Sequence, residues 1–203
     1  MIEVPDWLPY DVSRETFDKF LTFAALIEKW TKSINLIAGS TANDIFQRHI
    51  WDSVQVFQPF SGKWVDMGSG GGFPGVVIAI LTQSQRLTGE VVLIESDQRK
   101  ATFLRTCARQ LDVPITVIAN RIERVEPQDA KIVSARALSR LTNLFDLSAP
   151  HLSADGMAIF QKGSRWRLEI NEARKDWLFS YEAVPSKTDK DAAILKIKDI
   201  QRV

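Results

Sequence analysis

The sequence has few of the features that mark secreted or membrane-bound proteins. Cys107 is the only cysteine among 203 residues, so no disulfide can form within the chain. The N-terminus has neither the basic start nor the apolar run of a signal peptide. The longest unbroken apolar stretch, residues 76–81, is far shorter than the roughly 20 residues that a membrane-spanning helix needs. These absences predict a cytoplasmic protein that does not contact a membrane.

Metal ligands and catalytic bases are also scarce. The chain has two histidines, and its His, Cys, Asp and Glu residues show no spacing typical of a metal site. No arrangement suggests a Ser-His-Asp triad. Cys107 lies in a helical pattern without an identifiable partner base, which favours a packed thiol over a nucleophile. We therefore predict neither a metal nor a catalytic dyad.

The net charge gives little indication of a nucleic-acid partner. Lys and Arg total 26 and Asp and Glu total 25, so the formal net charge is +1. The charges are nevertheless uneven, because residues 1–30 are mainly acidic whereas residues 99–109 and 162–175 are rich in Lys and Arg. On charge alone, two solvated helix faces explain these basic segments better than a phosphate-binding surface does.

The hydrophobic pattern changes near residue 60. Before this point apolar residues recur at helical spacing, as in Phe17, Phe20 and Ala24, which predicts a helical extension over residues 1–60. After Gly62, short β-branched runs alternate with amphipathic stretches. The expected strands are 63–67, 90–95, 115–119, 130–135, 157–161, 181–184 and 193–198, and the expected helices begin near Pro74, Asp97 and Ser139, with a fourth over 165–177.

This succession predicts an α/β fold of the Rossmann-like type. We expect residues 61–203 to form a mostly parallel seven-stranded sheet with helices on both faces. The extension of residues 1–60 is expected to pack on this domain, so that the chain forms one structural unit. In such sheets ligands bind outside the carboxyl ends of the strands. The functional residues should therefore lie at those ends.

The first expected strand runs into a glycine-rich turn. Five of the eight residues from 68 to 75 are glycine, more than a tight strand-to-helix turn requires, so we predict that the turn binds a ligand. Gly70, Gly72 and Gly75 also fit the dinucleotide pattern G-x-G-x-x-G. The turn by itself therefore leaves two ligands open, a dinucleotide and S-adenosylmethionine.

Charge and bulk around the turn favour S-adenosylmethionine. Asp66 can reach the ammonium group of this cofactor, directly or through water. Phe73 and Pro74 stand where a pyrophosphate would have to lie against helix amides. S-adenosylmethionine presents an ammonium and a sulfonium, whereas a dinucleotide presents two phosphates that would prefer a basic or neutral turn. We therefore predict an S-adenosylmethionine-dependent methyltransferase fold.

Two further positions suit the rest of this cofactor. Glu95 closes the second expected strand, where a carboxylate can accept both ribose hydroxyl protons. A helix-start acid ahead of Asp97 is the simpler alternative for Glu95. After the third strand, the backbone amides of residues 120–123 and the carboxylate of Glu123 are placed to contact the adenine edge.

Several segments match, in order, those of a known family. The most specific are the turn Gly-Ser-Gly-x-Gly-Phe-Pro-Gly at residues 68–75 and the basic-His-x-x-Asp-Ser segment at residues 48–53. The other matches are Asn35-Leu36-Ile37, Leu93-Ile94-Glu95-Ser96, Arg99-Lys100, Phe103-Leu104, Ser134-Ala135-Arg136-Ala137 and Gln161-Lys162-Gly163. From about residue 15 to 165 the chain resembles the glucose-inhibited division protein B family, bacterial methyltransferases that act on guanine N7 in 16S ribosomal RNA.

The resemblance implies methylation of N7 of one guanine in 16S ribosomal RNA, with the RNA or the small ribosomal subunit as partner. It also implies cofactor contacts at Gly68, Phe73, Ile122, Glu123 and Arg136. Guanine N7 attacks with an unprotonated lone pair, so no general base is expected. The rate must then come from positioning and from electrostatics.

Arg136 ends the fourth expected strand, and we predict that it has this positioning role. It would face the methyl end of the cofactor and could donate to the guanine, a phosphate or the cofactor carboxylate. A salt bridge to Asp66 or Glu123 is the structural alternative. His49 and Asp52 share one helix face, and we expect them mainly to pack the helical extension over the turn.

Lys162 follows the fifth strand, and with Arg165 and Arg167 it is expected to meet RNA phosphate. We expect a monomer. Three alternatives remain open at this point: a methyltransferase that acts on a small molecule or a protein, a cofactor-binding regulatory module without catalysis, and a dinucleotide oxidoreductase.

Overall fold

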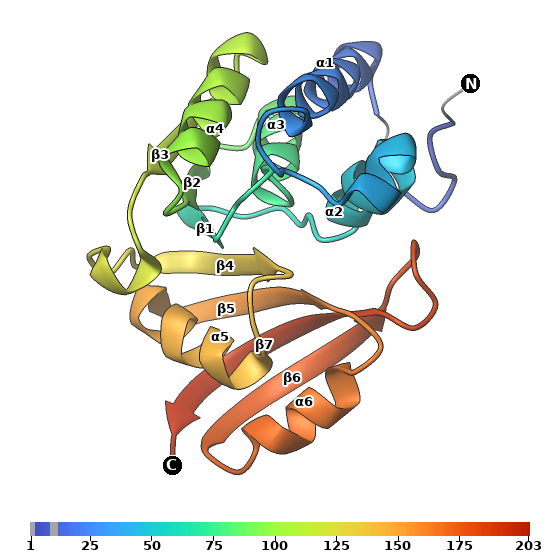
Figure 1. The fold of residues 1–203 in the computed structure, drawn as a ribbon. Helices are drawn as coiled ribbons and strands as arrows, with labels where there is room; N and C mark the ends of the chain where they lie inside the picture. Colours follow the sequence, from blue (N-terminus) through green and yellow to red (C-terminus); the bar gives the residue numbers. More distant parts are fainter. Residues whose placement is uncertain (1–2, 9–11) are drawn as a thin grey trace.

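The computed structural model describes residues 3–8 and 12–203, which form one seven-stranded sheet with helices on both faces (Figure 1). The strands are β1 Lys63–Met67, β2 Glu90–Ile94, β3 Ile115–Ile118, β4 Ala130–Arg136, β5 Leu152–Lys162, β6 Trp177–Pro185 and β7 Ala193–Arg202. The α-helices are α1 Arg14–Thr31, α2 Asp52–Val54, α3 Gly75–Ser84, α4 Gln98–Gln110, α5 Leu141–Ser148 and α6 Trp166–Ala173. The predicted Rossmann-like α/β class is confirmed.

The strand order, β3-β2-β1-β4-β5-β7-β6, places a switch of winding direction at the centre of the sheet. The neighbours among β1 to β5 pair in parallel, whereas β7 is antiparallel to both β5 and β6. The chain winds outward from β1 to β3 and then returns to the centre with β4. A crevice forms at such a switch point, beyond the carboxyl ends of the strands. The glycine-rich turn after β1 lies at this crevice.

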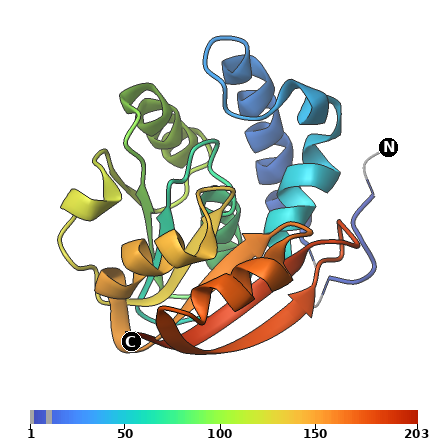
Figure 2. The same ribbon diagram turned by 60° about the horizontal axis from the view of Figure 1, so that its bottom comes forward.

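Helices cover both faces of the sheet, as Figures 1 and 2 show. Helices α1 to α4 lie on one face, and α5 and α6 lie on the other. Each face has its own hydrophobic cluster, with Phe20, Ile78 and Phe103 fully buried in the first and Phe145 and Leu195 in the second. Strands β1 and β2 are buried at four of their five positions, as expected for central parallel strands.

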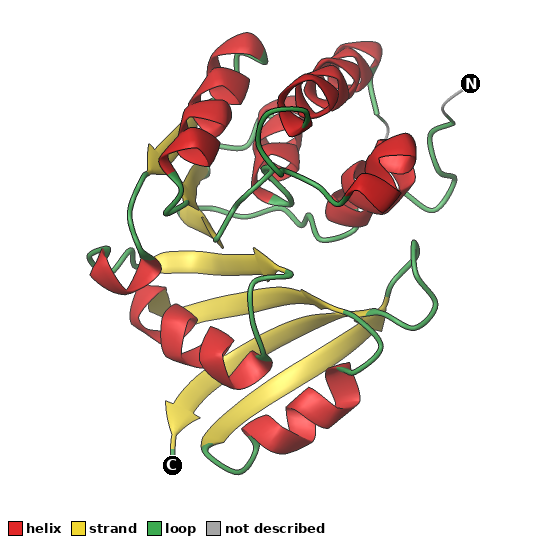
Figure 3. Cartoon of the chain, in the orientation of Figure 1, coloured by secondary structure: helices red, strands yellow, loops and turns green. Residues whose placement is uncertain are grey.

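The N-terminal helices share the core of the first face. Helix α1 is capped by Ser13, whose Oγ accepts a hydrogen bond from Thr16 N at 3.1 Å. Its buried side chains belong to the same cluster as those of α3. After a 3-10 turn at Gly39–Asp44, a turn of π-helix, Phe46–Trp51, runs directly into α2 (Figure 3). This segment reaches the carboxyl ends of β4 and β5, where Asp52 contacts Arg136 and Gln161.

Three strands are clearly longer than the sequence pattern predicts. Strand β5 begins at Leu152 instead of residue 157, β6 begins at Trp177 instead of residue 181, and β7 ends at Arg202 instead of residue 198. The helix expected over 165–177 ends at Ala173 accordingly. The added parts of β5 and β7 carry exposed polar residues such as Asp155 and Asp199, so they lack the apolar alternation on which strand prediction depends. The added part of β6 begins at Trp177, which the sequence pattern assigned to the preceding helix.

Candidate active site

The glycine-rich turn joins β1 to α3 and is bonded to the end of β2. Gly68 and Gly72 have φ angles of +63° and +86°, a region that L side chains rarely adopt. A Cβ atom on Gly68 would lie 2.6 Å from Leu138 Cδ1. Ser69 N donates to Ile94 O at 3.1 Å, which ties the turn to β2. These constraints explain why the sequence has glycine at both positions.

A cleft of about 420 Å³ opens beside this turn, at the carboxyl ends of β1, β2 and β4. The volume falls within the range of small-molecule sites. Several of the predicted cofactor-binding residues line the cleft, namely Gly68, Gly70, Glu95, Ile122, Glu123 and Arg136. Residues far apart in the sequence therefore meet in one cleft. A Cβ atom on Gly70 would meet only Gly68 O, at 3.7 Å, and would otherwise point into open space. Glycine at this position therefore keeps that space free of a side chain.

Asp66 is buried beneath the turn and does not line the cleft. Its side chain has no exposure, and burial raises its pKa to about 6. Oδ1 accepts from Ser134 Oγ at 2.7 Å, and Oδ2 accepts from Gly75 N at 3.3 Å. Asp66 therefore does not face the cleft directly, and its predicted contact with the cofactor, directly or through water, stays a prediction. The carboxyl group instead ties together β1, β4 and the start of α3.

Gly72 and Phe73 are also buried outside the cleft lining. The Phe73 ring lies 5.0 Å from the Phe23 ring and 5.1 Å from the His49 ring, measured between centroids. It therefore packs the extension against the turn. The predicted contacts of Gly72 and Phe73 with the cofactor stay predictions.

Glu95 connects the glycine-rich turn to the segment before α4. Its Oε2 accepts from Gly70 N at 2.8 Å, and its Oε1 accepts from Asp97 N at 2.7 Å. Each carboxylate oxygen has two lone pairs, so each can accept one more bond from a ligand hydroxyl in the cleft. Helix α4 has a separate cap, because Asp97 Oδ1 accepts from Arg99 N and Lys100 N. Glu95 is thus not needed as a helix-start acid.

The far end of the cleft combines apolar side chains with a 3-10 turn after β3. This turn, Ile122–Arg124, includes the buried Ile122 and the exposed Glu123. Ile94, Leu138 and Leu147 also line the cleft. These apolar side chains among mostly polar lining residues offer contact area for a planar aromatic base.

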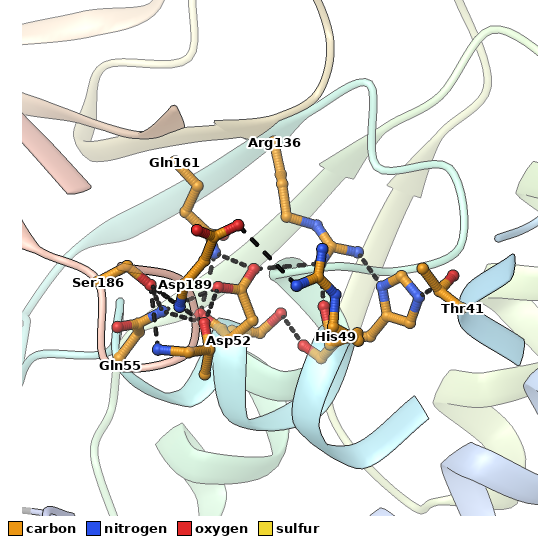
Figure 4. A network of polar contacts seen from close by, with 11 residues as sticks. Thr41, His49, Asp52, Gln55, Arg136, Gln161, Ser186 and Asp189 are labelled. Carbon is orange, nitrogen blue, oxygen red and sulfur yellow. Dashed lines mark hydrogen bonds and ion pairs between the residues drawn. The ribbon is translucent and has the colours of Figure 1, made fainter. Parts of the chain in front are cut away.

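Arg136, at the end of β4, is held by several contacts at once (Figure 4). Its guanidinium donates from Nη1 to Asp52 Oδ2 at 3.3 Å and from Nη2 to His49 Nδ1 at 3.0 Å. Nη1 also donates to Arg48 O at 3.3 Å, and Cζ lies 4.8 Å from the centroid of the Phe73 ring. The expected alternative partners, Asp66 and Glu123, form no salt bridge with Arg136 among the described residues.

Asp52 is the centre of this polar network. Its Oδ2 also accepts from Gln161 Nε2 at 2.6 Å, and its Oδ1 accepts from Gln55 Nε2 and Thr188 Oγ1 at 2.8 and 2.7 Å. Gln55 Oε1 in turn accepts from Lys187 N at 2.8 Å. The network therefore joins the N-terminal extension to the ends of β4 and β5 and to the loop between β6 and β7.

His49 takes part in the network as a neutral ring. Its Nδ1 accepts from Arg136, which leaves the ring proton on Nε2, 2.8 Å from Thr41 Oγ1. Burial, together with the charges of Arg136 and Arg48, lowers the pKa of His49 to about 4. At neutral pH the ring therefore stays uncharged and keeps its bond with Arg136.

We expect His49 to make the protein less stable as the pH falls from 6.5 towards 4. The unfolded chain protonates this residue near its ordinary pKa of 6.5, whereas the folded protein does so only near 4. The unfolded state then binds more protons in this window, so stability that is complete above pH 6.5 is lost below it. In thermal unfolding between pH 4 and 7.5, the Tm difference between wild type and His49→Gln should shrink with falling pH. A constant difference would contradict this.

The three predicted RNA-binding residues differ in their exposure to solvent. Arg165 and Arg167 are exposed, and the Arg167 guanidinium lies 4.2 Å from the centroid of the Trp166 ring. The Lys162 side chain is only 10% exposed, and its Nζ lies 2.7 Å from Glu169 Oε2. Lys162 is therefore held by Glu169 at the edge of a cavity, and its predicted contact with RNA phosphate stays a prediction.

Three further features of the described residues bear on what the chain can do: its single thiol, its possible metal ligands and the apolar length of its helices. Cys107 is buried in α4, and burial raises the pKa of its thiol well above the usual range. Among residues 3–8 and 12–203, no group of His, Cys, Asp and Glu is arranged to hold a metal ion. Within the same ranges, no helix is both long and apolar enough to cross a membrane.

The residues that hold Arg136 were not predicted as functional. The sequence nevertheless marks them, since His49 and Asp52 belong to the basic-His-x-x-Asp-Ser segment and Gln161 begins the Gln-Lys-Gly segment. Spacing could not show that these segments meet at the end of β4. The structure now gives that specific pattern a physical explanation.

The strand order, the glycine-rich turn after β1 and the acidic residue closing β2 define a class, the S-adenosylmethionine-dependent methyltransferases. Solved structures agree in fold. The chain is similar to M. jannaschii TYW2 in complex with AdoMet, with a TM-score of 0.56 and 13% identity over 85% of this chain and 80% of that one. It is also similar to a fibrillarin/Nop5p complex, with a TM-score of 0.52 and 10% identity over 76% of this chain and 83% of that one.

Residues 16–195 match the GidB family, described as rRNA small subunit methyltransferase G, and the chain belongs to this family. Relatives named ribosomal RNA small subunit methyltransferase G include one from Ruegeria pomeroyi, 46% identical over 98% of this chain and 99% of the relative. Another, from Cereibacter sphaeroides, is 49% identical over 95% of this chain and 94% of the relative. The family resemblance and the methyltransferase class predicted from the sequence are confirmed.

Proposed function

We propose that the chain transfers a methyl group from S-adenosylmethionine to N7 of one guanine in 16S ribosomal RNA of the small subunit. The observation that carries this proposal is the family match over residues 16–195. The relatives named ribosomal RNA small subunit methyltransferase G support the RNA substrate. The cleft supports S-adenosylmethionine as the cofactor, because the glycine-rich turn, Glu95 and Arg136 all line it.

The cleft fits the cofactor part by part. Glu95 has spare lone pairs for the ribose hydroxyls, and the apolar side chains near Ile122 suit the adenine ring. The amides of Gly68 and Gly70 lie nearer the centre of the sheet. Three positive side chains line the cleft, those of Lys100, Arg121 and Arg136. Arg136, at the end of β4, is the positive group that we assign to hold the cofactor carboxylate or orient the guanine.

The reaction needs no proton acceptor at its start. S-adenosylmethionine supplies a methyl carbon on a positively charged sulfur, and guanine N7 has the lone pair that forms the new bond while the carbon–sulfur bond breaks. The chain contributes orientation and a fixed electrostatic environment. His49 accepts a hydrogen bond from Arg136 through Nδ1 and so holds the guanidinium instead of acting as a base.

We expect labelled methyl to be transferred from S-adenosylmethionine to small ribosomal subunits, or their RNA, from cells that lack this protein. Mapping by mass spectrometry should place the label on N7 of a single guanine. The matched control is subunits from cells that contain the protein, which should accept little label because the site is already modified.

Absence of label on RNA and on subunits, despite cofactor binding, would overturn the proposal. A methyltransferase for a small molecule or a protein, or a regulatory module without catalysis, would then be favoured. The dinucleotide alternative no longer stands, because the chain belongs to a methyltransferase family. We further propose a cytoplasmic monomer, and light scattering would test its mass.

A further inference from the structure

A second cavity lies beside Arg136, next to the cofactor cleft. Its volume is about 250 Å³, and its walls come from α2, α6, the ends of β4 and β5, and the loop between β6 and β7. Arg136 and Ala137 line both hollows, so the two are neighbours across the end of β4. The second cavity is smaller than most cofactor sites and suits a single base turned out of an RNA stack.

A shielded ion pair forms part of the wall of this cavity. The side chains of Lys162 and Glu169 are 10% and 18% exposed, and Lys162 Nζ lies 2.7 Å from Glu169 Oε2. Lys162 also donates to Ser139 O at 2.9 Å, and Glu169 Oε2 also accepts from Leu141 N at 2.9 Å. Among the described residues, the third proton of Lys162 and the other oxygen of Glu169, Oε1, have no partner.

The unpartnered proton of Lys162 and the unpartnered oxygen of Glu169 indicate which ligand the cavity can bind. Lys162 and Glu169 both line the cavity, so a ligand there can bond to the spare proton and the spare oxygen. A spare donor and a spare acceptor stand side by side on one wall.

Two other acids line this cavity: Asp52 already accepts four hydrogen bonds, and Asp189 pairs with Arg48 at 3.9 Å. Gln161 Oε1 is a further unpartnered acceptor among the lining residues, but only the shielded ion pair offers a spare charged donor beside a spare charged acceptor to a base.

We propose that the second cavity receives the target guanine and that Glu169 and Lys162 read its Watson–Crick edge. Glu169 accepts from N1–H and from the N2 amino group, and Lys162 donates to O6. Adenine presents the opposite pattern, with an acceptor at N1 towards the carboxylate and an amino group towards the ammonium. The pair thus accepts guanine and rejects adenine. This inference rests on the proposed function.

The arrangement leaves the reacting atom free. N7 lies on the edge that adjoins O6, so a guanine bound through its Watson–Crick edge keeps N7 unengaged. Only the end of β4, with Arg136 and Ala137, lies between this base and the cofactor cleft. The inference also changes the expected role of Lys162 from a phosphate contact to a base contact.

The first test replaces Glu169 with glutamine. Glutamine can still accept from Leu141 N, but it loses the charge and presents an amino group to the donors of guanine. We expect kcat/KM for methyl transfer to the subunit to fall by about 10- to 100-fold. Cofactor affinity in calorimetry should stay within about twofold, since Glu169 does not line the cleft. Glu172→Gln, an exposed change on the same helix, should retain full activity.

A second test separates base reading from a structural role. Inosine lacks the N2 amino group of guanine, and it can be placed at the mapped position by joining RNA fragments before reconstitution. The wild type should lose about fivefold or more in kcat/KM on inosine. Glu169→Gln should lose little more on inosine than on guanine, because the contact is already missing.

The outcomes distinguish the two proposals. If the wild type methylates no guanine, the proposed function itself fails. If the wild type is active and Glu169→Gln matches Glu172→Gln, the guanine-reading inference is wrong while the function stands. Fully multiplicative effects of inosine and Glu169→Gln would likewise overturn it, since they would show that Glu169 acts without touching N2.

Discussion

Replacing Arg136 with lysine is expected to lower kcat/KM for methyl transfer by about 100- to 1000-fold, the usual loss when one preorganised donor is removed from an active site. The guanidinium reaches Asp52 and His49 with separate nitrogens and stacks over Phe73. A lysine ammonium has one centre of charge and cannot reproduce this fork. Single-turnover methyl transfer to the subunit would measure the loss directly.

Two further variants make this expectation specific. Arg14→Lys changes an exposed arginine on α1 and should leave kcat/KM unchanged. Asp52→Asn keeps the shape of the side chain but removes the charge that pairs with Arg136, so a smaller loss of about tenfold is expected. Activity of Arg136→Lys within twofold of the wild type would show that the guanidinium has no part in the reaction.

Replacing Gly75 with alanine is expected to destabilise the fold by about 3 kcal/mol, the upper end for overpacking a core. A Cβ atom there would lie 2.2 Å from Leu93 Cδ2 and 2.8 Å from Asp66 Oδ2. It would also disturb the bond from Gly75 N to Asp66. The helix propensity of alanine offsets this by at most about 1 kcal/mol. For a chain of this length, a net loss of about 2 to 3 kcal/mol should lower Tm by roughly 4 to 12 °C.

Gly39→Ala is the matched control for this effect. A Cβ atom on Gly39 has nothing within 4 Å, so its Tm should change by no more than about 2 °C. Calorimetric scans of the three proteins at one pH would show the difference. A Gly75→Ala protein as stable as Gly39→Ala would mean that Leu93 and Asp66 move aside at little cost.

The sequence predicted best what depends on local pattern. Strand β1 was predicted at its observed bounds, and the glycine-rich turn after it lies at the expected cleft. Glu95 was also placed correctly at the end of β2, because strand ends in a parallel sheet meet at one edge. These features follow from residues that are neighbours in sequence or in sheet order.

The contacts that hold the site together depend on tertiary packing and escaped prediction. Arg136 and Asp52 are 84 residues apart, and nothing in their spacing shows that the extension packs near the end of β4. Asp66 has the sequence position of a ligand-binding acid, but its side chain turns towards Ser134. In the sequence Lys162 resembles a surface lysine, and only the fold shows that Glu169 on α6 lies beside it.

The bonds from Asp52 and Gln55 to the loop between β6 and β7 affect how the chain gains activity during its own synthesis. Proteins emerge from the ribosome N-terminus first, and early segments can fold before later ones exist. Here the acid that anchors Arg136 accepts a hydrogen bond from Thr188, so its hydrogen bonds are completed only after the segment that contains Thr188 has been synthesised. A prematurely terminated product that binds the cofactor would still lack this support. Competence for methyl transfer thus requires the hairpin of β6 and β7.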